Sequence, residues 1–217
     1  PIANSHRSLY NVGYMKRTHG LSLLVVLAIL VTGVTHSGQA QSSDSVYVSE
    51  TGHWIWGDFL QTYNSVPDPL LYFGYPITED FNDPITNQRV QYFQRARFEF
   101  HSELPPGAQV ILGNLGRELH RIADAPVPNN FTPWDVNKRY FPQTGHIVSN
   151  AFLAFFDAHG RETFMGFPLT EAFLANGGVV QYFEKVRMEW HPENPAAYQV
   201  QLGLLGTERY AQVGPAR

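Results

Sequence analysis

The sequence of 217 residues contains no cysteine. Disulfide bonds, thiolate metal sites and cysteine nucleophiles are therefore excluded. Charged residues are also scarce, because Asp, Glu, Lys and Arg together make up 16% of the chain, whereas hydrophobic residues make up 43%. Chains that stay disordered have the opposite balance, with high charge and low hydrophobicity. The composition therefore predicts a folded protein with a hydrophobic core.

Positive charge is in short supply. The chain has 15 Lys and Arg residues against 19 Asp and Glu residues, which gives a net charge of -4. A protein that binds DNA or RNA has to neutralise phosphates with a cationic surface. The charge balance therefore predicts that nucleic acid is not a partner.

Residues 1–40 have the composition of a targeting segment. Two cations follow Met15, an apolar run covers residues 21–31, and small residues lead up to Ala40. This order predicts a secretory signal peptide cleaved after Ala40, with residues 1–14 an extension of the reading frame. The alternative is a retained membrane anchor, but the apolar run falls short of the roughly 20 residues that a membrane-spanning helix needs.

Cleavage after Ala40 would change the charge balance. The first forty residues hold three cations and no acid, so residues 41–217 keep 12 basic and 19 acidic residues, a net charge of -7. Such a chain is a poor ligand for anionic membranes. An exported protein without cysteine is typical of the outside of a bacterial cell. We expect a secreted or cell-surface protein with no membrane span after cleavage.

Residues 41–121 and 138–217 contain the same motifs in the same order. The matching pairs are Thr51-Gly52-His53 with Thr144-Gly145-His146, Phe73-Gly74-Tyr75-Pro76 with Met165-Gly166-Phe167-Pro168, Val90-Gln91-Tyr92-Phe93 with Val180-Gln181-Tyr182-Phe183, and Leu112-Gly113 with Leu202-Gly203. Self-similarity of this kind is typical of a duplicated structural unit. Residues 122–137, which contain three prolines, are predicted to be the linker between the two units.

Each unit is predicted to mix helices and strands. Apolar spacing from Ile55 to Tyr63 predicts a helix, and residues 78–81 predict a short helical turn that a threonine caps. Residues 90–101 predict a β-hairpin, residues 109–112 a further strand, and the Leu-Gly-x-Leu-Gly segment after it a closing helix. The fold class expected is α+β, with two tandem copies of a small unit of helix plus antiparallel β-hairpin.

The Gly-aromatic-Pro step, the hairpin and the Pro-Gly-Ala-Gln-Val stretch at 106–110 resemble the LGFP-type repeats of secreted bacterial proteins. Phe73 and Met165 take the place of the usual leucine of that family. The chain is also similar to paired repeats in exported bacterial proteins, which often stand beside peptidase or wall-acting domains. The resemblance implies association with the cell wall rather than catalysis.

A row of polar residues on the second strand of the hairpin is the first candidate site. Its members occur in both copies and are Arg97, Glu99 and His101, with Arg187, Glu189 and His191. Alternation along a strand places the three residues of a copy on one face. They could transfer a proton or hold a polar ligand, or they could form ion pairs across the strands that stabilise the fold. Both copies carry these three residues, which favours the structural role of ion pairs over a single active site.

Aromatic residues that are not tied to the repeat form the second candidate site: Trp54, Trp56, Tyr63 and Trp134. The second copy has Ile147 and Ser149 in place of the two tryptophans Trp54 and Trp56, so the core does not require indole rings there. Exposed rings could stack on sugar faces, or they could pack between the two units.

The remaining motifs speak against catalysis and metal binding. His53 and His146 follow a glycine and are predicted either to cap the first helix of each copy or to make a hydrogen bond to the backbone. Glu79 and Glu171 are predicted to lie in a helical first turn rather than form a glycosidase pair. The sequence has no HExxH motif, no phosphate-binding loop and no G-x-S-x-G elbow. We expect no cofactor, no metal and no catalytic residue.

Three hypotheses about function follow. The first is a non-catalytic exported repeat protein that binds cell-wall or envelope glycan. The second is an accessory module of an envelope complex that binds another protein. The third, which the lack of catalytic motifs disfavours, is a hydrolase that uses groups such as Glu99 and His101.

Overall fold

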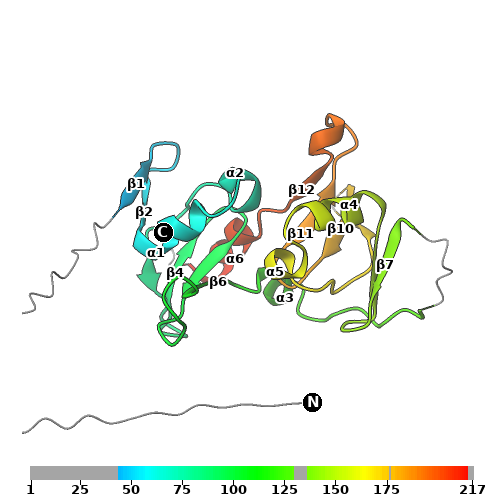
Figure 1. Ribbon diagram of the computed structural model, residues 1–217, viewed down its shortest axis with the longest axis horizontal. Helices are drawn as coiled ribbons and strands as arrows, with labels where there is room; N and C mark the ends of the chain where they lie inside the picture. Colours follow the sequence, from blue (N-terminus) through cyan, green and yellow to red (C-terminus); the bar gives the residue numbers. More distant parts are fainter. Residues whose placement is uncertain (1–43, 130–135, 176, 215–217) are drawn as a thin grey trace, which may run out of the picture. The chain divides into compact units, whose positions relative to one another are not determined.

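The computed structural model describes residues 44–129, 136–175 and 177–214. By their contacts, residues 41–217 group as one unit (Figure 1). The predicted signal peptide and Trp134 lie outside the described residues. Among the residues that are described, no helix is long and apolar enough to cross a membrane.

The fold is α+β. Over the described ranges it has six α-helices, one short 3-10 helix and four small antiparallel sheets. For brevity, residues 41–121 are called the first half and residues 138–217 the second half.

A two-stranded hairpin opens each half. In the first half β1 (Ser45–Val48) pairs with β2 (His53–Trp56), and in the second half β7 (Lys138–Phe141) pairs with β8 (His146–Ser149). The turn of the first hairpin contains Gly52, whose positive φ of 75° favours glycine.

A helix follows each hairpin directly. These helices are α1 (Gly57–Tyr63) and α4 (Asn150–Ala158). The prediction that the first helix includes Ile55 is wrong, because Ile55 lies in β2. Ile55 is fully buried between two exposed tryptophans, which is the two-residue period of a strand. Of the two roles predicted for His53, capping of this helix is wrong, because His53 lies at the start of β2.

A four-stranded antiparallel sheet forms the centre of each half. In the first half the order is β3 (Phe81–Asn82), β4 (Arg89–Tyr92), β5 (Arg97–Phe100) and β6 (Val110–Leu112). In the second half it is β9 (Phe173–Ala175), β10 (Gly178–Tyr182), β11 (Arg187–Trp190) and β12 (Val200–Leu202). The predicted hairpin and the strand after it are confirmed.

The helical turn predicted at residues 78–81 is wrong. Residues 78–80 are not helical: a bend at residue 78 and two residues without regular structure lead into β3, the edge strand of the sheet. The hydroxyl of Thr78 does not cap a helix; it accepts a hydrogen bond from the backbone N–H of Tyr92 at 3.1 Å. Thr170 does the same for Tyr182 at 3.2 Å, ahead of β9. The threonines therefore attach the edge of each sheet to its neighbouring strand.

Three short helices complete the structure. Helices α2 (Pro69–Tyr72) and α5 (Arg161–Met165) connect the first helix of each half to its sheet, and the 3-10 helix η1 (Ala196–Tyr198) lies between β11 and β12. Helix α2 begins at a proline, where the missing N–H costs nothing, and the Asp68 side chain caps it by accepting from Leu71 N–H at 3.1 Å.

The closing helices are α3 (Leu115–Leu119) and α6 (Leu205–Val213), as the sequence predicts. Each packs against the sheet of the opposite half. Helix α3 reaches the second half, where His120 stacks on Tyr182 with the ring centroids 4.8 Å apart. Helix α6 reaches the first half, where the ring centroid of Tyr210 lies 5.2 Å from that of Tyr92. A single hydrophobic cluster, which includes Phe93, Phe98, Phe156 and Phe183, spans both halves.

Candidate functional site

Three aromatic rings lie together on the hairpin of the first half. The ring of Trp54 is 5.2 Å from that of Tyr47 and 5.2 Å from that of Trp56, with the two indoles nearly parallel at 27°. Tyr47 is 52% exposed, Trp54 39% and Trp56 41%. We call Tyr47, Trp54 and Trp56 the aromatic platform. The three rings lie in a row, and each is partly open to solvent.

Strand periodicity explains why these side chains meet. Trp54 and Trp56 are two residues apart on β2, so they share the face opposite to the buried Ile55. Tyr47 is the register partner of Trp54 on β1. Cross-strand partners lie about 5 Å apart, which brings the third ring into the row.

Two polar side chains hold the platform strand in place. The buried amide of Gln91 on β4 donates to the carbonyl oxygen of Trp54 at 2.7 Å and to that of Thr78 at 2.9 Å. The carboxylate of Glu79 accepts from the backbone N–H of Trp54 at 3.1 Å and contacts Nδ1 of His53 at 3.4 Å. The prediction that Glu79 serves in a helical first turn is therefore wrong.

Sequence reasoning missed the role of Gln91. The signal was available, because a glutamine recurs inside the apolar Val-Gln-Tyr-Phe strand of both halves. Gln181 is also buried, and it donates to the carbonyl oxygens of Ile147 at 2.7 Å and of Thr170 at 2.8 Å. A buried amide needs hydrogen-bond partners, and here the partners join the hairpin to the sheet.

We call the glutamine and glutamate that support each hairpin, Gln91 and Glu79 in the first half, its frame. The second half has the same frame, Gln181 and Glu171, without the indoles. Glu171 accepts from the backbone N–H of Ile147 at 3.0 Å and lies 3.3 Å from Nδ1 of His146, which is buried. Ile147 and Ser149 stand where the first half has Trp54 and Trp56. These contacts support the hairpin in both halves. Tyr47 also has a counterpart, Tyr140, which is the register partner of Ile147, so only the two indoles are specific to the first half.

Tyr63 does not join the platform. Its ring packs in the core, stacked on Phe93 at 5.4 Å, and its hydroxyl donates to the carbonyl oxygen of Gly74 at 3.2 Å. Burial raises the pKa of Tyr63 to about 12. Tyr63 therefore serves the fold, which corrects its assignment as a binding residue.

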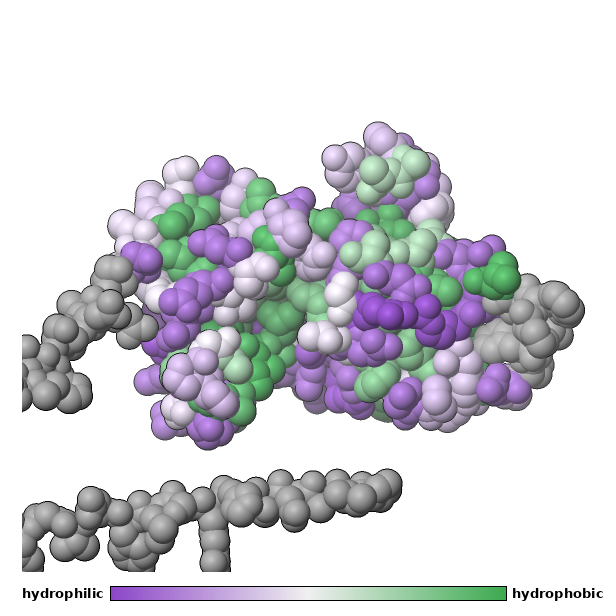
Figure 2. Space-filling model, in the orientation of Figure 1, coloured by the Kyte–Doolittle hydropathy of each residue, from purple (hydrophilic) through white to green (hydrophobic). Residues whose placement is uncertain are grey.

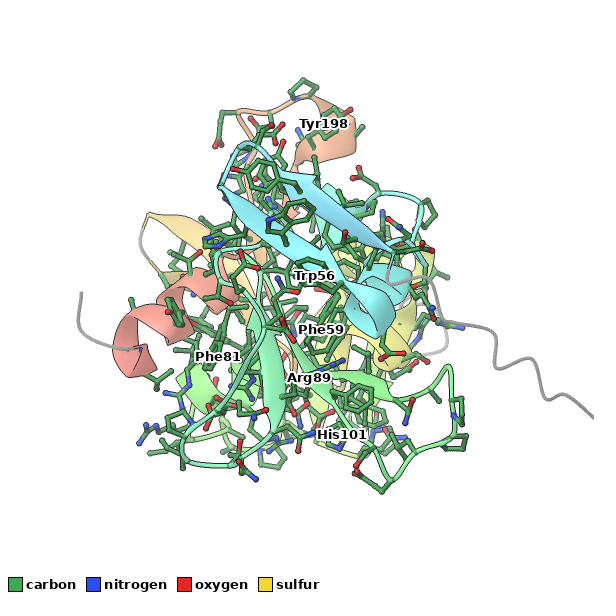
Figure 3. All side chains as sticks on the ribbon, turned by 90° about the vertical axis from the view of Figure 1, so that its left-hand side faces the viewer. Trp56, Phe59, Phe81, Arg89, His101 and Tyr198 are labelled. Atoms are coloured by element: carbon green, nitrogen blue, oxygen red, sulfur yellow. The ribbon has the colours of Figure 1, made fainter. Side chains whose placement is uncertain are left out.

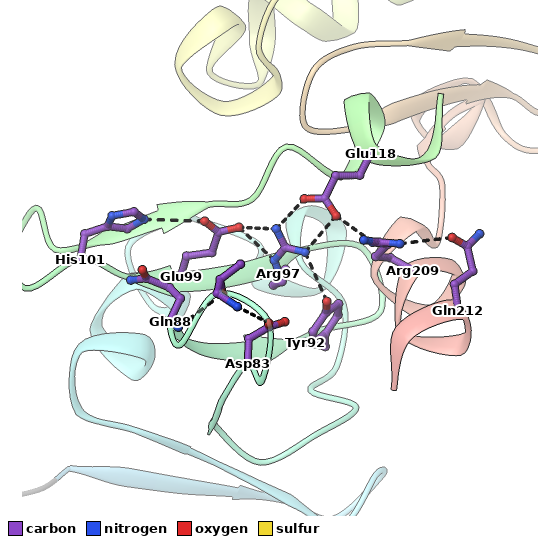
Figure 4. A network of polar contacts seen from close by, with 10 residues as sticks. Asp83, Gln88, Tyr92, Arg97, Glu99, His101, Glu118, Arg209 and Gln212 are labelled. Atoms are coloured by element: carbon purple, nitrogen blue, oxygen red, sulfur yellow. Dashed lines mark hydrogen bonds and ion pairs between the residues drawn. The ribbon is translucent and has the colours of Figure 1, made fainter. Parts of the chain in front are cut away.

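The row of Arg97, Glu99 and His101 lies together on β5, as predicted. Figure 4 shows that Arg97 is the centre of the network: its Nε donates to Glu99 at 2.9 Å and its Nη2 to Glu118 of α3 at 2.6 Å. Its Nη1 also donates to the hydroxyl of Tyr92 at 3.2 Å. Burial opposes the charge of Arg97, but these partners outweigh it and raise its pKa.

The interpretation of this row as ion pairs across strands is wrong in its geometry. The residues opposite Glu99 on the neighbouring strands are Val90 and Ile111, which carry no charge. The ion pairs run along β5 and to α3 instead. They end at His101, which lies 3.6 Å from Glu99 and 2.8 Å from Glu103.

The second half repeats this network. Arg187 donates to Glu189 at 2.8 Å and to Glu208 of α6 at 2.7 Å, and His191 lies between Glu189 and Glu193. One difference is Arg209, which donates to Glu118 of the first network at 2.7 Å and so joins α6 to α3. The two arginines Arg97 and Arg187 are each held by two carboxylates of the same half, which leaves them poorly suited to bind an external anion.

Open pockets lie beside both networks. One of about 290 Å³ is bordered by Arg97, Glu118 and Arg209. Another of about 490 Å³ is bordered by Arg187, Glu189 and His191. Among the residues that the structure describes, no group of three or more His, Asp and Glu side chains converges as a metal site would require.

Comparison with known proteins adds no relative. No protein-family model matches the chain, and no curated protein sequence matches it.

Proposed function

We propose that this chain is a non-catalytic exported protein, built from two tandem copies of one unit, that binds cell-envelope polysaccharide through the aromatic platform. The observation that carries the proposal is the row of three exposed rings, Tyr47, Trp54 and Trp56. The resemblance to LGFP-type repeats and the predicted signal peptide support the location outside the cell.

Aromatic rings in a row suit the flat apolar faces of sugars. A tryptophan that is about 40% exposed leaves on the order of 100 Å² of ring for a ligand to cover, which corresponds to about 2 kcal/mol per indole. Two indoles and a tyrosine side by side would contact successive sugar units of a chain. The hydrogen bonds from Gln91 and to Glu79 fix the strand beforehand, which reduces the entropy lost on binding.

The charge of the chain limits the type of glycan. Residues 41–217 carry a net charge of -7. A strongly anionic polymer would be repelled, so we propose an uncharged or weakly charged polysaccharide as the ligand. In Figure 2 hydrophilic residues on the visible face alternate with groups of hydrophobic ones, the largest near the middle of the face.

The tandem copies are supported by matched contacts. The glutamine bridge and the arginine network recur in both halves, at Gln91 and Gln181 and at Arg97 and Arg187. We propose that duplication supplied two copies of a hairpin frame, and that the first copy carries the glycan-binding rings.

Sedimentation with insoluble peptidoglycan tests the proposal. The purified fragment 41–217 is expected to co-sediment. The double variant Trp54→Ala/Trp56→Ala is expected to bind with an affinity at least 30-fold lower, which corresponds to a total loss of about 2 kcal/mol or more of binding free energy. Tyr198→Ala is the matched control, because it removes an exposed ring from η1, away from the hairpin. A gain-of-function variant, Ile147→Trp/Ser149→Trp, is expected to strengthen binding by adding a second platform.

Two results would overturn the proposal. The first is a wild-type protein that does not sediment with peptidoglycan or with another envelope polysaccharide. The second is a Trp54→Ala/Trp56→Ala variant that binds as well as Tyr198→Ala does. Capture of an envelope protein through the same tryptophans would instead support the accessory-module hypothesis.

A further inference from the structure

The two halves differ sharply at one place beside the hairpin. In the first half the guanidinium of Arg89 on β4 lies over two rings, 4.8 Å from the centroid of Phe59 and 4.3 Å from that of Phe100. Figure 3 shows Arg89 next to Phe59, below the end of β2. Asp58 at 3.5 Å and Asp80 at 3.9 Å balance its charge. A planar cation therefore occupies this space.

In the second half the rings remain and the charges are gone. Phe152 and Trp190 take the positions of Phe59 and Phe100, and Trp190 is the register partner of Val179 just as Phe100 is of Arg89. Val179 stands where Arg89 is in the first half, and Ala151 and Ala172 stand at the positions of the two aspartates.

These replacements leave an open pocket of about 240 Å³. It is lined by Ser149, Asn150, Ala151, Phe152, Ala172, Val179 and Trp190. The lining carries no charged side chain, and its only polar side chains are Ser149 and Asn150. A space that the first half fills with its own arginine is therefore open to solvent in the second half.

We infer that this pocket is a binding site for a neutral aromatic ring. In the first half the planar guanidinium of Arg89 lies over two rings. In the second half the cradle consists of the buried Phe152, 5% exposed, and the half-buried Trp190, which both line the pocket, so a planar group fits there as well. A charged group is disfavoured, because both aspartates and the arginine are replaced together and nothing in the lining would balance a charge. A sugar is disfavoured as well, because its hydroxyls would meet few polar partners.

The site is separate from the aromatic platform. The platform is made by β1 and β2 of the first half, whereas the pocket is made by residues of β8, α4, β10 and β11 in the second half, together with Ala172. Binding of an aromatic ring here does not depend on whether the platform binds glycan. The pocket would give the protein a second ligand class.

Titration of the full chain with indole tests this inference. The side-chain N–H signal of Trp190, assigned by its loss in Trp190→Phe, is followed in proton–nitrogen correlation spectra. We expect a saturable shift with a Kd in the millimolar range, which is usual for one small ring in an open pocket. The variant Trp54→Ala/Trp56→Ala should leave this shift unchanged.

A transplant between the halves provides the decisive variant. Ala151→Asp/Ala172→Asp/Val179→Arg places the first-half residues in the second half, where the arginine is expected to fill the cradle and weaken indole binding at least tenfold. If the triple variant does not fold, Ala172→Leu serves in its place. It narrows the pocket without adding charge and should also weaken indole binding.

Three outcomes would overturn the inference. They are a Trp190 signal that does not respond to indole, variants that fold and bind indole as the wild type does, and a neutral methyl glycoside that shifts the Trp190 signal at lower concentration than indole. The last result would make the pocket a sugar site.

Discussion

The crossing of the closing helices allows a sharp prediction at two glycines. Gly116 of α3 packs on the backbone of the second half, where an added Cβ would overlap the carbonyl oxygen of Phe183 and lie 3.0 Å from that of Val186. Gly206 of α6 packs in the same way on the first half, where a Cβ would overlap the carbonyl oxygen of Phe93. Backbone atoms cannot rotate away as a side chain can, so Gly→Ala at either position has to displace a helix.

The cost can be worked from the contacts that the helix would lose. Overpacking costs about 1 to 3 kcal/mol, and a shifted α3 would also weaken the hydrogen bond from Arg117 N–H to the carbonyl oxygen of Glu184 at 3.0 Å, worth about 1 kcal/mol. The higher helix propensity of alanine returns about 1 kcal/mol. We expect Gly116→Ala and Gly206→Ala each to destabilise the fold by about 1 to 3 kcal/mol.

Urea or thermal unfolding followed by circular dichroism measures this loss. For a chain of this size, about 1 to 3 kcal/mol corresponds to a fall in Tm of roughly 2 to 12 °C. Gly178→Ala is the matched control, because its Cβ would meet only the carbonyl oxygen of Trp190 at an ordinary 3.5 Å. If Gly116→Ala and Gly206→Ala were both as stable as Gly178→Ala, the packing of each closing helix on the opposite half would be refuted.

Two further predictions concern polar side chains. Burial raises the pKa of Glu118, but hydrogen bonds from Arg97 and Arg209 outweigh it and lower the pKa below the ordinary value of 4.5. The stability that this carboxylate contributes is therefore present above pH 4.5 and lost as the pH falls through its lowered pKa. Glu118→Gln should lower the free energy of unfolding by about 2 kcal/mol at neutral pH and make stability depend less on pH in the acid range. Glu208→Gln should lower it by less, because Glu208 pairs with Arg187, whereas Glu118 pairs with Arg97 and Arg209. Equal losses of stability in urea titrations would contradict the role of Arg209. Gln91→Leu should cost about 2 kcal/mol and weaken peptidoglycan binding, because it frees the carbonyl oxygen of Trp54; unchanged binding would show that the bridge does not order the platform.

The repeated sheet was predictable because its signals are local. Alternation in Val90–His101 puts Phe98 on the buried face and Arg97 and Glu99 on the other, and the structure confirms both strands. The closing helices were also predictable from their Leu-Gly-x-Leu-Gly pattern, since Leu115 and Gly116 are buried. In each of these cases neighbours in the sequence are sufficient to decide the element.

The errors arise where short strands meet short helices. The spacing of Ile55, Phe59 and Tyr63 fits the period of a helix. Ile55, however, lies in β2, and the other two residues lie in α1, so the apparent helix consists of two elements. The threonine at position 78 resembles a helix cap for a similar reason. Its true acceptor role depends on Tyr92, which is 14 residues away and becomes a neighbour only when the sheet forms.

The candidate site shows the same limit at longer range. The absence of tryptophan at the matching positions of the second half left two alternatives open, exposed rings or packing between the units. The structure shows both indoles exposed, and their contact with Tyr47 depends on the register of β1 with β2. The partner of Arg97 on α3, Glu118, lies 21 residues away in the sequence. Spacing within the strand identified the row of polar residues but not the helix that neutralises it.

Comparison of the two halves separates residues that support the fold from residues available for binding. Gln91 and Gln181 make equivalent hydrogen bonds, so they belong to the frame that each hairpin needs. The position of Trp54 holds isoleucine in the second half, and that of Arg89 holds valine. Both positions lie on a frame that is intact in each half, so the fold tolerates either residue at each of them. Both sites that we propose bind ligands, the aromatic platform and the pocket of the second half, therefore lie where the two halves differ.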